Sequence, residues 1–211
     1  MGTTLALFDF DGTITTNDSF IKFIRFVVGD AKFVCGMALL APVLIAYKLK
    51  LIPNYKAKQM TFSYFFKGMS KENFLQIANE YSLEHIDAIL RPQAIQKIQH
   101  HKDQGHKVVI VSASIEFWLK PWCSKHDLDL IATKLEIKDG VVTGKFLTKN
   151  CYGIEKMFRI KEVYNLEDYD YIYSYGDSRG DVEMLEIADM AYYKPFREGW
   201  FNLNNSIFSI K

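Results

Sequence analysis

Cysteine is scarce in this chain of 211 residues, which has only Cys35, Cys123 and Cys151, widely separated along the sequence. This spacing fits neither a disulfide framework nor a zinc site, so we expect a reducing compartment. An excess of charge of one sign is also lacking, because 26 lysines and arginines stand against 25 aspartates and glutamates. The formal net charge of +1 gives no argument for a nucleic acid as the partner.

Long hydrophobic runs are absent as well. The uncharged segment at residues 33–47 is shorter than the roughly 20 residues that cross a bilayer, and Pro42 interrupts it. The N-terminus shows neither the basic stretch nor the cleavage site of a signal peptide, which favours a cytoplasmic protein. Hydrophobic residues nevertheless make up 49% of the chain and aromatic residues 15%, which is ample for a packed core and excludes disorder.

Acidic residues are missing from residues 31–71, whereas lysine is frequent there. Two interpretations stay open. In the first, residues 33–47 form a hairpin of buried helices with a solvated rim of lysines. In the second, apolar burial and basic charge together hold this segment against anionic lipid, at the inner face of a membrane. The lysines concerned are Lys32, Lys48, Lys50, Lys56, Lys58, Lys67 and Lys71.

What is present begins with residues 5–13, where a run of apolar strand formers ends in two carboxylates and a glycine. Such a run bounded by a turn is typical of a buried strand in a parallel sheet. Asp9 and Asp11 share one face of the extended chain, and Gly12 allows a sharp turn close to a ligand. Open α/β sheets bind their ligands at the carboxyl ends of such strands. An EF-hand calcium loop is excluded, because Phe20 stands where that loop needs a glutamate.

Further strands alternate with helical patterns along the chain. Residues 108–111 form an apolar run that ends at Ser112, and residues 171–175 form another, followed by a turn that contains Asp177 and Asp181. Strands that alternate with helices predict an α/β fold, a Rossmann-like doubly wound parallel sheet. We also expect short strands at residues 130–132 and 190–193, and a hairpin at residues 135–142 that turns at Asp139-Gly140.

The first two core strands are separated by a segment far longer than an ordinary crossover. Apolar residues recur in it at helical spacing, with Asp18 or Ser19 as one helix cap and Ser70 as another. We therefore predict a helical cap domain at residues 16–91, inserted over the carboxyl edge of the sheet. The α/β core domain then comprises residues 1–15 and 92–211.

The polar residues that end three core strands form an inventory for phosphoryl transfer. Clustered carboxylates cannot all ionise without counter-charge. Their oxygens suit Mg²⁺, which takes one or two carboxylates, water and a substrate phosphate. A serine can donate to a phosphate oxygen, a lysine can supply positive charge, and an aspartate can act as a nucleophile. The residues concerned are Asp9, Asp11, Ser112, Lys156, Asp177 and Asp181.

These motifs resemble, in order, the four motifs of the haloacid dehalogenase superfamily. The chain is most similar to the phosphoserine-phosphatase-like branch, subfamily IB, which carries a helical cap after the first motif. Residues 9–13 (DFDGT) resemble the first motif, residues 111–112 the second and Lys156 the third. Gly176-Asp177 with Asp181 resembles the fourth. The resemblance covers nearly the whole chain.

The resemblance implies a Mg²⁺-dependent phosphomonoester hydrolase with an aspartyl-phosphate intermediate. Asp9 would attack phosphorus, and Asp11 would protonate the leaving oxygen and then activate water. Mg²⁺ would bind to Asp9, Asp177 and the main-chain carbonyl of Asp11, with Asp181 supporting them from close by. The phosphate-binding positions that the resemblance implies are Phe10, Ser112, Ala113 and Lys156.

The substrate is less constrained, because the chain departs from phosphoserine phosphatases. Gly180 stands where they carry an asparagine, the shorter Asp18 aligns with the cap glutamate that reads the substrate amine, and their cap arginine has no clear counterpart. The apolar, lysine-flanked cap instead resembles phosphatidylglycerophosphatases of the C type. A small phosphomonoester, phosphoserine and a lipid phosphate, the last with peripheral membrane contact through the cap, all stay open. The alternative outside enzymes is a phospho-accepting signalling domain, although such a domain would lack a cap of this size.

Overall fold

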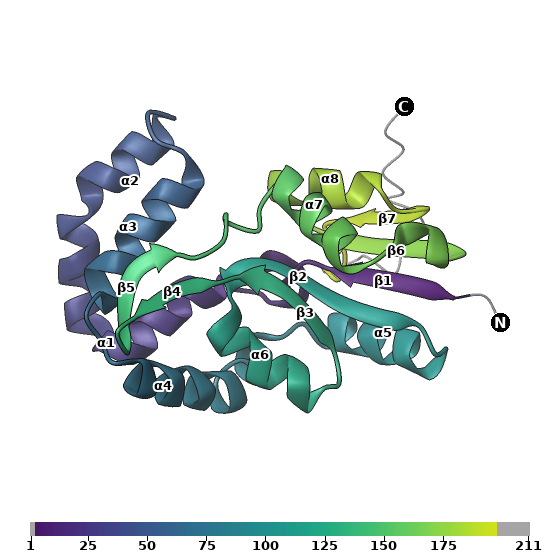
Figure 1. Cartoon of the computed structure of the whole chain (residues 1–211), viewed down its shortest axis with the longest axis horizontal. Helices are drawn as coiled ribbons and strands as arrows, with labels where there is room; N and C mark the ends of the chain where they lie inside the picture. Colours follow the sequence, from purple (N-terminus) through teal and green to yellow (C-terminus); the bar gives the residue numbers. More distant parts are fainter. Residues whose placement is uncertain (1–2, 198–211) are drawn as a thin grey trace.

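The computed structural model describes residues 3–197 and contains a five-stranded parallel sheet in the order β3-β2-β1-β6-β7 (Figure 1). In the central strand β1, Phe8 pairs with Ile110 of β2 on one side and with Tyr175 of β6 on the other. The predicted strands are confirmed, and β2 continues past Ser112. The strands are β1 (Thr4–Phe8), β2 (Lys107–Ile115), β3 (Asp129–Thr133), β6 (Tyr171–Gly176) and β7 (Met190–Tyr193).

Helices cover both faces of this sheet, as a doubly wound fold requires. Because side chains alternate along a strand, Ala6 and Phe8 of β1 join the larger apolar core with α5 and α6. Leu5 and Leu7 point the other way and join a smaller core with α7 and α8. These helices are α5 (Pro92–Asp103), α6 (Glu116–Lys125), α7 (Ile154–Val163) and α8 (Val182–Glu186).

The segment between β1 and β2 is helical, and none of its residues from 16 to 91, all of which the structure describes, belongs to a strand. Asp18 caps its first helix by accepting a hydrogen bond from the Ile21 N–H, and Ser70 caps its fourth. The predicted helical insertion is therefore confirmed, whereas the domain boundaries drawn from the sequence stay a prediction. The helices are α1 (Ser19–Leu39), α2 (Ala41–Lys48), α3 (Asn54–Phe66), α4 (Lys71–Glu84) and the short η2 (Asp87–Ile89).

The predicted hairpin turns at Asp139-Gly140, whose positive φ values of 50° and 74° fit a two-residue hairpin turn. Its strands, β4 (Leu135–Lys138) and β5 (Val141–Phe146), form a sheet of their own that packs on α3 of the insertion (Figure 1). Val142 donates a backbone hydrogen bond to Met69 and accepts one from Gly68, each 2.9 Å long. The hairpin is thus bonded to the insertion, although it lies far from it in sequence.

Residues 33–47 form the end of α1 and most of α2, and the interpretation of this segment as a buried hairpin is wrong for most of it. Only Gly36 and Leu40 are buried, whereas Val34 and Leu39 are 64% and 69% exposed. Within residues 3–197, no single helix is long and apolar enough to cross a membrane. Taken together, α1 and α2 are long and apolar enough to cross a membrane by length and composition, but a bend of 58° separates the two helices.

Candidate active site

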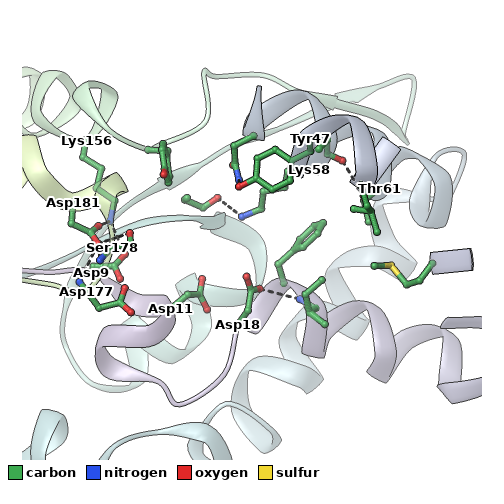
Figure 2. Close-up of a pocket in the computed structure, with 18 residues that line it drawn as sticks. Asp9, Asp11, Asp18, Tyr47, Lys58, Thr61, Lys156, Asp177, Ser178 and Asp181 are labelled. Atoms are coloured by element: carbon green, nitrogen blue, oxygen red, sulfur yellow. Dashed lines mark hydrogen bonds and ion pairs between the residues drawn. The ribbon is translucent and has the colours of Figure 1, made fainter. Parts of the chain in front are cut away.

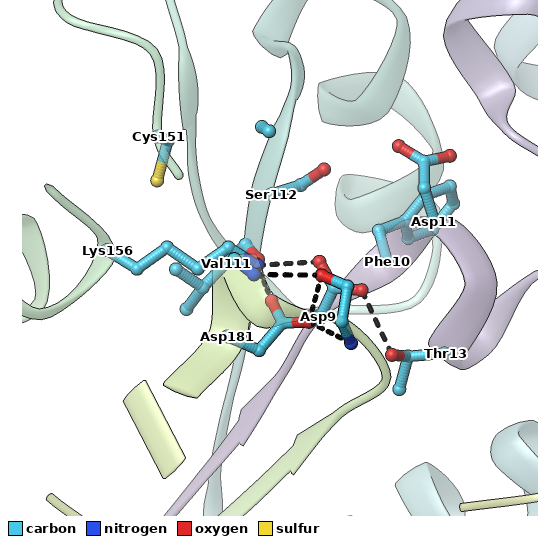
Figure 3. Close-up of polar contacts among 12 residues, drawn as sticks. Asp9, Phe10, Asp11, Thr13, Val111, Ser112, Cys151, Lys156 and Asp181 are labelled. Atoms are coloured by element: carbon cyan, nitrogen blue, oxygen red, sulfur yellow. Dashed lines mark hydrogen bonds and ion pairs between the residues drawn. The ribbon is translucent and has the colours of Figure 1, made fainter. Parts of the chain in front are cut away.

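Asp9, which follows β1, lies close to Asp181, which follows β6, and to Lys156 of α7, and Ser112 of β2 lies nearby (Figure 3). The chain turns immediately after β1 through η1 (Phe10–Ile14), in which Gly12 adopts a φ of 86°. A Cβ atom on Gly12 would lie 2.5 Å from Oδ2 of Asp177. Glycine at this position therefore permits the turn and also leaves room for a carboxylate from the neighbouring strand.

Lys156 is the centre of the site and is only 1% exposed. Its Nζ donates to Oδ1 of Asp9 at 2.6 Å, to Oδ1 of Asp181 at 2.7 Å and to the main-chain oxygen of Val111 at 2.7 Å (Figure 3). Burial alone would lower the pKa of Lys156, but the carboxylates of Asp181 and Asp9 outweigh burial and raise it above the ordinary value. The ammonium group therefore stays charged and fixes the side chain of Asp9.

Asp181 organises the loop after β6. Its Oδ2 accepts hydrogen bonds from the backbone N–H of Asp177 at 3.1 Å, from that of Ser178 at 2.9 Å and from the Ser178 hydroxyl at 2.8 Å. Burial would raise the pKa of Asp181, but Lys156 outweighs burial and lowers it. Asp181 is thus an ionised carboxylate that holds Lys156 on one side and the Asp177 loop on the other.

Three carboxylates form a cluster that fits a divalent cation. One oxygen from each of Asp9, Asp177 and Asp181 lies within 4.8 Å of the others. Burial and the Asp181 charge raise the pKa of both Asp9 and Asp177, although Lys156 acts in the opposite direction on both. Arg197 also donates to Oδ2 of Asp177, at 3.0 Å, from the exposed side. Hard carboxylate oxygens with an excess of negative charge match the preferences of Mg²⁺.

The carboxylate of Asp11 points away from this cluster, toward the insertion (Figure 2). Its Oδ1 accepts from the Ser19 N–H at 2.6 Å, and its Oδ2 accepts from the Ser114 hydroxyl at 2.5 Å. Burial raises the pKa of Asp11, and the nearby Asp18 raises it further, against the opposing charge of Lys58. Asp9 and Asp11 are therefore two carboxyl groups held apart in different surroundings.

The predicted phosphate-binding positions flank Asp9. Ser112 is buried in β2, and its Oγ accepts from the Ser114 N–H at 3.0 Å, a bond that does not use the hydroxyl hydrogen. Ala113 follows it and lines the cavity described below. The ring of Phe10 packs in the core against Trp122, with 5.3 Å between the centroids. Only the main chain of Phe10 can therefore contribute to phosphate binding.

A cavity of about 330 Å³ lies between the sheet edge and the insertion (Figure 2). Asp9, Asp11, Lys156 and Asp177 line its core side. The insertion supplies a wall that is mostly apolar but contains several polar groups. Those residues are Asp18, Phe20, Ile21, Met37, Leu44, Tyr47, Asn54, Ala57, Lys58 and Thr61.

Lys58 is a functional candidate that the sequence alone does not single out, because it stands in a run of lysines that is typical of a solvated rim. Its Nζ instead lies in the cavity, donates to the main-chain oxygen of Ala113 at 3.0 Å and stands 4.9 Å from the ring centroid of Phe20. Asn54, Lys58 and Thr61 are spaced at i, i+4 and i+7 along α3, so they share one helix face. That spacing is the signal that could have identified Lys58.

Two positions at which the chain differs from phosphoserine phosphatases lie at or beside this cavity, namely Gly180 and Asp18. A Cβ atom on Gly180 would lie 2.3 Å from the ring of Tyr152, so a side chain at position 180 has no room. Tyr152 occupies that space and lines the cavity. Asp18 lines the cavity as well, while its Oδ1 accepts from the Ile21 N–H at 3.1 Å.

Comparison with known proteins identifies the class. The family profile of haloacid dehalogenase-like hydrolases matches residues 6–186. Protein CicA of Caulobacter vibrioides is 35% identical over 195 residues, which cover 92% of this chain and 86% of that protein. A histidinol-phosphatase of Neisseria meningitidis serogroup C is 24% identical over 198 residues, which cover 87% of this chain and 86% of that protein. The chain belongs to the haloacid dehalogenase-like hydrolases. Within that family it is a hydrolase of the phosphatase type.

Solved structures share the fold. A protein of unknown function from Bordetella pertussis Tohama I superposes with a TM-score of 0.79 at 24% identity, over 90% of this chain and 89% of that one. A phospho-aspartyl intermediate analogue of phosphoserine phosphatase superposes with a TM-score of 0.59 at 22% identity, over 90% of this chain and 86% of that one. At these identities the likeness confirms the predicted α/β fold with its helical insertion.

Proposed function

We propose that the protein is a Mg²⁺-dependent phosphomonoester hydrolase that works through an aspartyl phosphate on Asp9. One observation carries the proposal, namely the separation of two carboxyl groups around one cavity. Asp9 is bound to Lys156 at the sheet edge, whereas Asp11 is held toward the insertion by two other contacts. A nucleophile and a separate proton donor thereby face the same space.

In the first step, a carboxylate oxygen of Asp9 attacks phosphorus, and the bond between phosphorus and the ester oxygen breaks. Asp11 gives its proton to the departing alcohol. Because burial and Asp18 raise the pKa of Asp11, this carboxyl group keeps its proton nearer to neutrality than an exposed aspartate does. Lys156 and the Ser112 hydroxyl stabilise the charge that builds up on the phosphoryl oxygens.

In the second step, water attacks the phosphorus of the aspartyl phosphate. Asp11 accepts a proton from that water, and the bond between phosphorus and the Asp9 oxygen breaks. Inorganic phosphate leaves, Asp9 is restored as a carboxylate and Asp11 is restored as an acid. One water is consumed in each cycle, and no oxidant or second substrate is needed.

The residues present fit a resident Mg²⁺. Asp9, Asp177 and the main-chain carbonyl of Asp11 would hold the ion, with Asp181 keeping the Asp177 loop in place. When bound, Mg²⁺ supplies positive charge that offsets both the carboxylate cluster and the substrate phosphate.

We propose a small or amphiphilic phosphomonoester as the substrate. The cavity wall from the insertion is largely apolar, with Lys58 as its cation. Phosphoserine is the second candidate, favoured by Asp18 in the cavity, where a carboxylate can meet an amine. A lipid phosphate such as phosphatidylglycerophosphate is the third, favoured by the exposed apolar side chains of α1 and α2.

Removal of the metal should silence the enzyme. Purified protein with Mg²⁺ should release inorganic phosphate continuously from at least one member of a phosphomonoester panel. A metal that stabilises phosphoryl transfer by several kcal/mol implies a loss of about 100-fold or more on chelation. Excess Mg²⁺ should restore the rate. A single phosphorylation without continued release would indicate a signalling domain, and turnover that survives chelation would contradict the metal assignment.

Lys58 should matter to turnover, although it lies outside the sheet. The change Lys58→Met keeps the aliphatic stem but removes the charge beside Asp11, and we expect kcat/KM to fall roughly 10- to 100-fold, the range for a hydrogen bond to a charged group. The exposed Lys56 lies two residues earlier on the same helix, so Lys56→Met is the matched control and should leave the rate with a small water-soluble phosphomonoester unchanged. Equal rates in both variants would contradict a role for Lys58.

Peripheral contact with lipid is part of the proposal and can be tested separately from catalysis. Lys48, Lys50 and Lys56 are exposed beside the apolar surface of α1 and α2, and each lysine near an anionic bilayer contributes about 1 kcal/mol. Their joint replacement by glutamate should therefore weaken binding to anionic vesicles at low salt by roughly 100-fold or more. Lys58 is left unchanged because it lies in the cavity. As the control, joint replacement of Lys120, Lys138 and Lys161 by glutamate should leave vesicle binding as it is in the wild type. Absence of vesicle binding by the wild-type protein would contradict the proposed lipid contact.

A further inference from the structure

A second hollow, of about 720 Å³, adjoins the catalytic cavity between α3 and the chain from β5 to α7. The two cavities share Asn54 and Tyr152 as lining residues, so they lie next to each other on either side of these two side chains. We call the second one the side groove. It is defined by Tyr55, Phe146, Leu147, Tyr152, Ile154 and Phe158.

The side groove concentrates exposed apolar side chains. Leu147, Ile154 and Phe158 are 64%, 51% and 47% exposed. Single exposed apolar residues are ordinary, but a group of them in one hollow of ligand size indicates a binding site. Ile154 and Phe158 are four residues apart on α7 and therefore present one helix face. The charged pair at the groove, Lys149 with Glu155, lies 4.0 Å apart, so the two opposite charges offset each other.

Hydrogen bonds hold the walls of the side groove in place. Asn54 donates to the Tyr47 hydroxyl at 3.1 Å and accepts from Asn150 at 3.4 Å, which ties α2, α3 and the β5–α7 chain together. Oε1 of Gln59 accepts from the Phe146 N–H at 3.1 Å, which ties α3 to β5. The groove is therefore formed before any ligand arrives, as is usual for small-molecule sites.

The shared wall connects the groove to the chemistry. The ring of Tyr152 lies against Gly180, in the loop that carries Asp177 and Asp181. Asn54 is one helical turn from Lys58, whose Nζ reaches Ala113. For an ester whose phosphate lies at Asp9, the alcohol would therefore reach the side groove by passing Asn54 and Tyr152.

We propose that the side groove binds the apolar chain of the alcohol, so that the substrate is the phosphomonoester of a single-chain amphiphilic alcohol. This inference rests on the proposed phosphatase function. The side groove then discriminates among phosphomonoesters, while the catalytic cavity contacts only the phosphate and the first atoms of the alcohol.

Straight-chain alkylphosphonates test the groove without turnover, because their carbon–phosphorus bond is not the ester bond that this chemistry cleaves. Calorimetric titration of the Mg²⁺-loaded protein with ethyl-, butyl-, hexyl- and octylphosphonate, each below its micelle concentration, gives affinity against chain length. Each methylene that enters the groove should tighten binding about fourfold, following the transfer free energy of a buried CH₂.

Substitutions in the side groove test whether the alkyl chain of the phosphonate binds there. Neither Ile154 nor Phe158 belongs to the two apolar cores, so the double change Ile154→Gln and Phe158→Gln should leave the fold and the ethylphosphonate affinity unchanged. It should remove most of the dependence on chain length. Val163→Gln is the matched control, because Val163 is 62% exposed on the same helix but lies outside the groove. This control should keep the wild-type dependence.

The outcomes separate the two proposals. If ethylphosphonate binds but longer chains bind no better, or if the double variant keeps the wild-type dependence, the groove inference fails and the phosphatase proposal stands. If no phosphonate binds, both fail. Hydrolysis of monomeric octyl phosphate, compared with lysophosphatidic acid in vesicles, then distinguishes a free amphiphile from a membrane lipid. Failure of both chain-bearing esters to exceed ethyl phosphate in kcat/KM would overturn the inference.

Discussion

Replacing Asp9 with asparagine should lower kcat by roughly four orders of magnitude or more, since loss of a catalytic nucleophile has effects of that size. The amide cannot form the aspartyl phosphate. Its oxygen can still accept from Lys156, which now donates to Asp9 Oδ1 at 2.6 Å, so the buried site should remain intact. Continuous phosphate release measures the activity, and thermal unfolding measures the fold.

Asp139→Asn is the control for the same chemical change at a distance. Asp139 is exposed at the hairpin turn with a φ of 50°, which asparagine adopts readily. This variant should retain wild-type turnover. A folded Asp9→Asn protein with a few per cent of wild-type activity would show that Asp9 is not the nucleophile.

Replacing Lys156 with methionine should destabilise the protein by about 3–5 kcal/mol, the cost of removing one partner from a buried ion pair. Asp9 and Asp181, both buried, would lose the cation that bonds to each of them. For a protein of this size the midpoint of thermal unfolding should fall by roughly 10 °C. Turnover should be lost as well, because the nucleophile is no longer fixed.

Thermal unfolding in a chelating buffer is the decisive measurement for Lys156, because it excludes any contribution from bound metal. Lys161→Met changes an exposed lysine on the same helix and should shift stability by no more than about 0.5 kcal/mol. Similar midpoints for the two variants would mean that the carboxylate cluster does not depend on the Lys156 charge.

Much of the core could be predicted because its signals are local. A strand that runs into Asp9 and Asp11, and another that runs into Gly176-Asp177, each contain their own strand pattern and turn. Parallel strands then bring these turns to one edge, and the structure places Asp9, Asp177 and Asp181 within 4.8 Å of one another. The convergence on Lys156 followed from its place near the start of α7, which points toward the same edge.

The insertion could not be predicted to the same depth, because its faces are decided by packing between helices. An uncharged run such as residues 33–47 is compatible with burial and with exposure, and the structure leaves Val34 and Leu39 exposed. Likewise, Lys56 and Lys58 read alike in sequence, yet only Lys58 faces the cavity. Which of two nearby lysines points inward depends on the rotation of α3 against the sheet, and no local pattern specifies that rotation.

The hydrogen bonds between the β4–β5 hairpin and the insertion limit how the insertion can move relative to the core. An inserted segment is joined to the core by two chain segments, one at each of its ends. Here these two segments are paired by hydrogen bonds from the Thr16 N–H to the Ile89 oxygen and from the Arg91 N–H to the Ile14 oxygen, each 2.8 Å long. The hairpin adds two more chain segments, joined at their base by the Leu147 N–H and the Lys134 oxygen at 2.8 Å. The insertion is therefore held to the core by four chain segments, which are arranged in two hydrogen-bonded pairs. Any movement of the insertion against the core must therefore bend both pairs at once, which disfavours free rotation of the insertion about either pair.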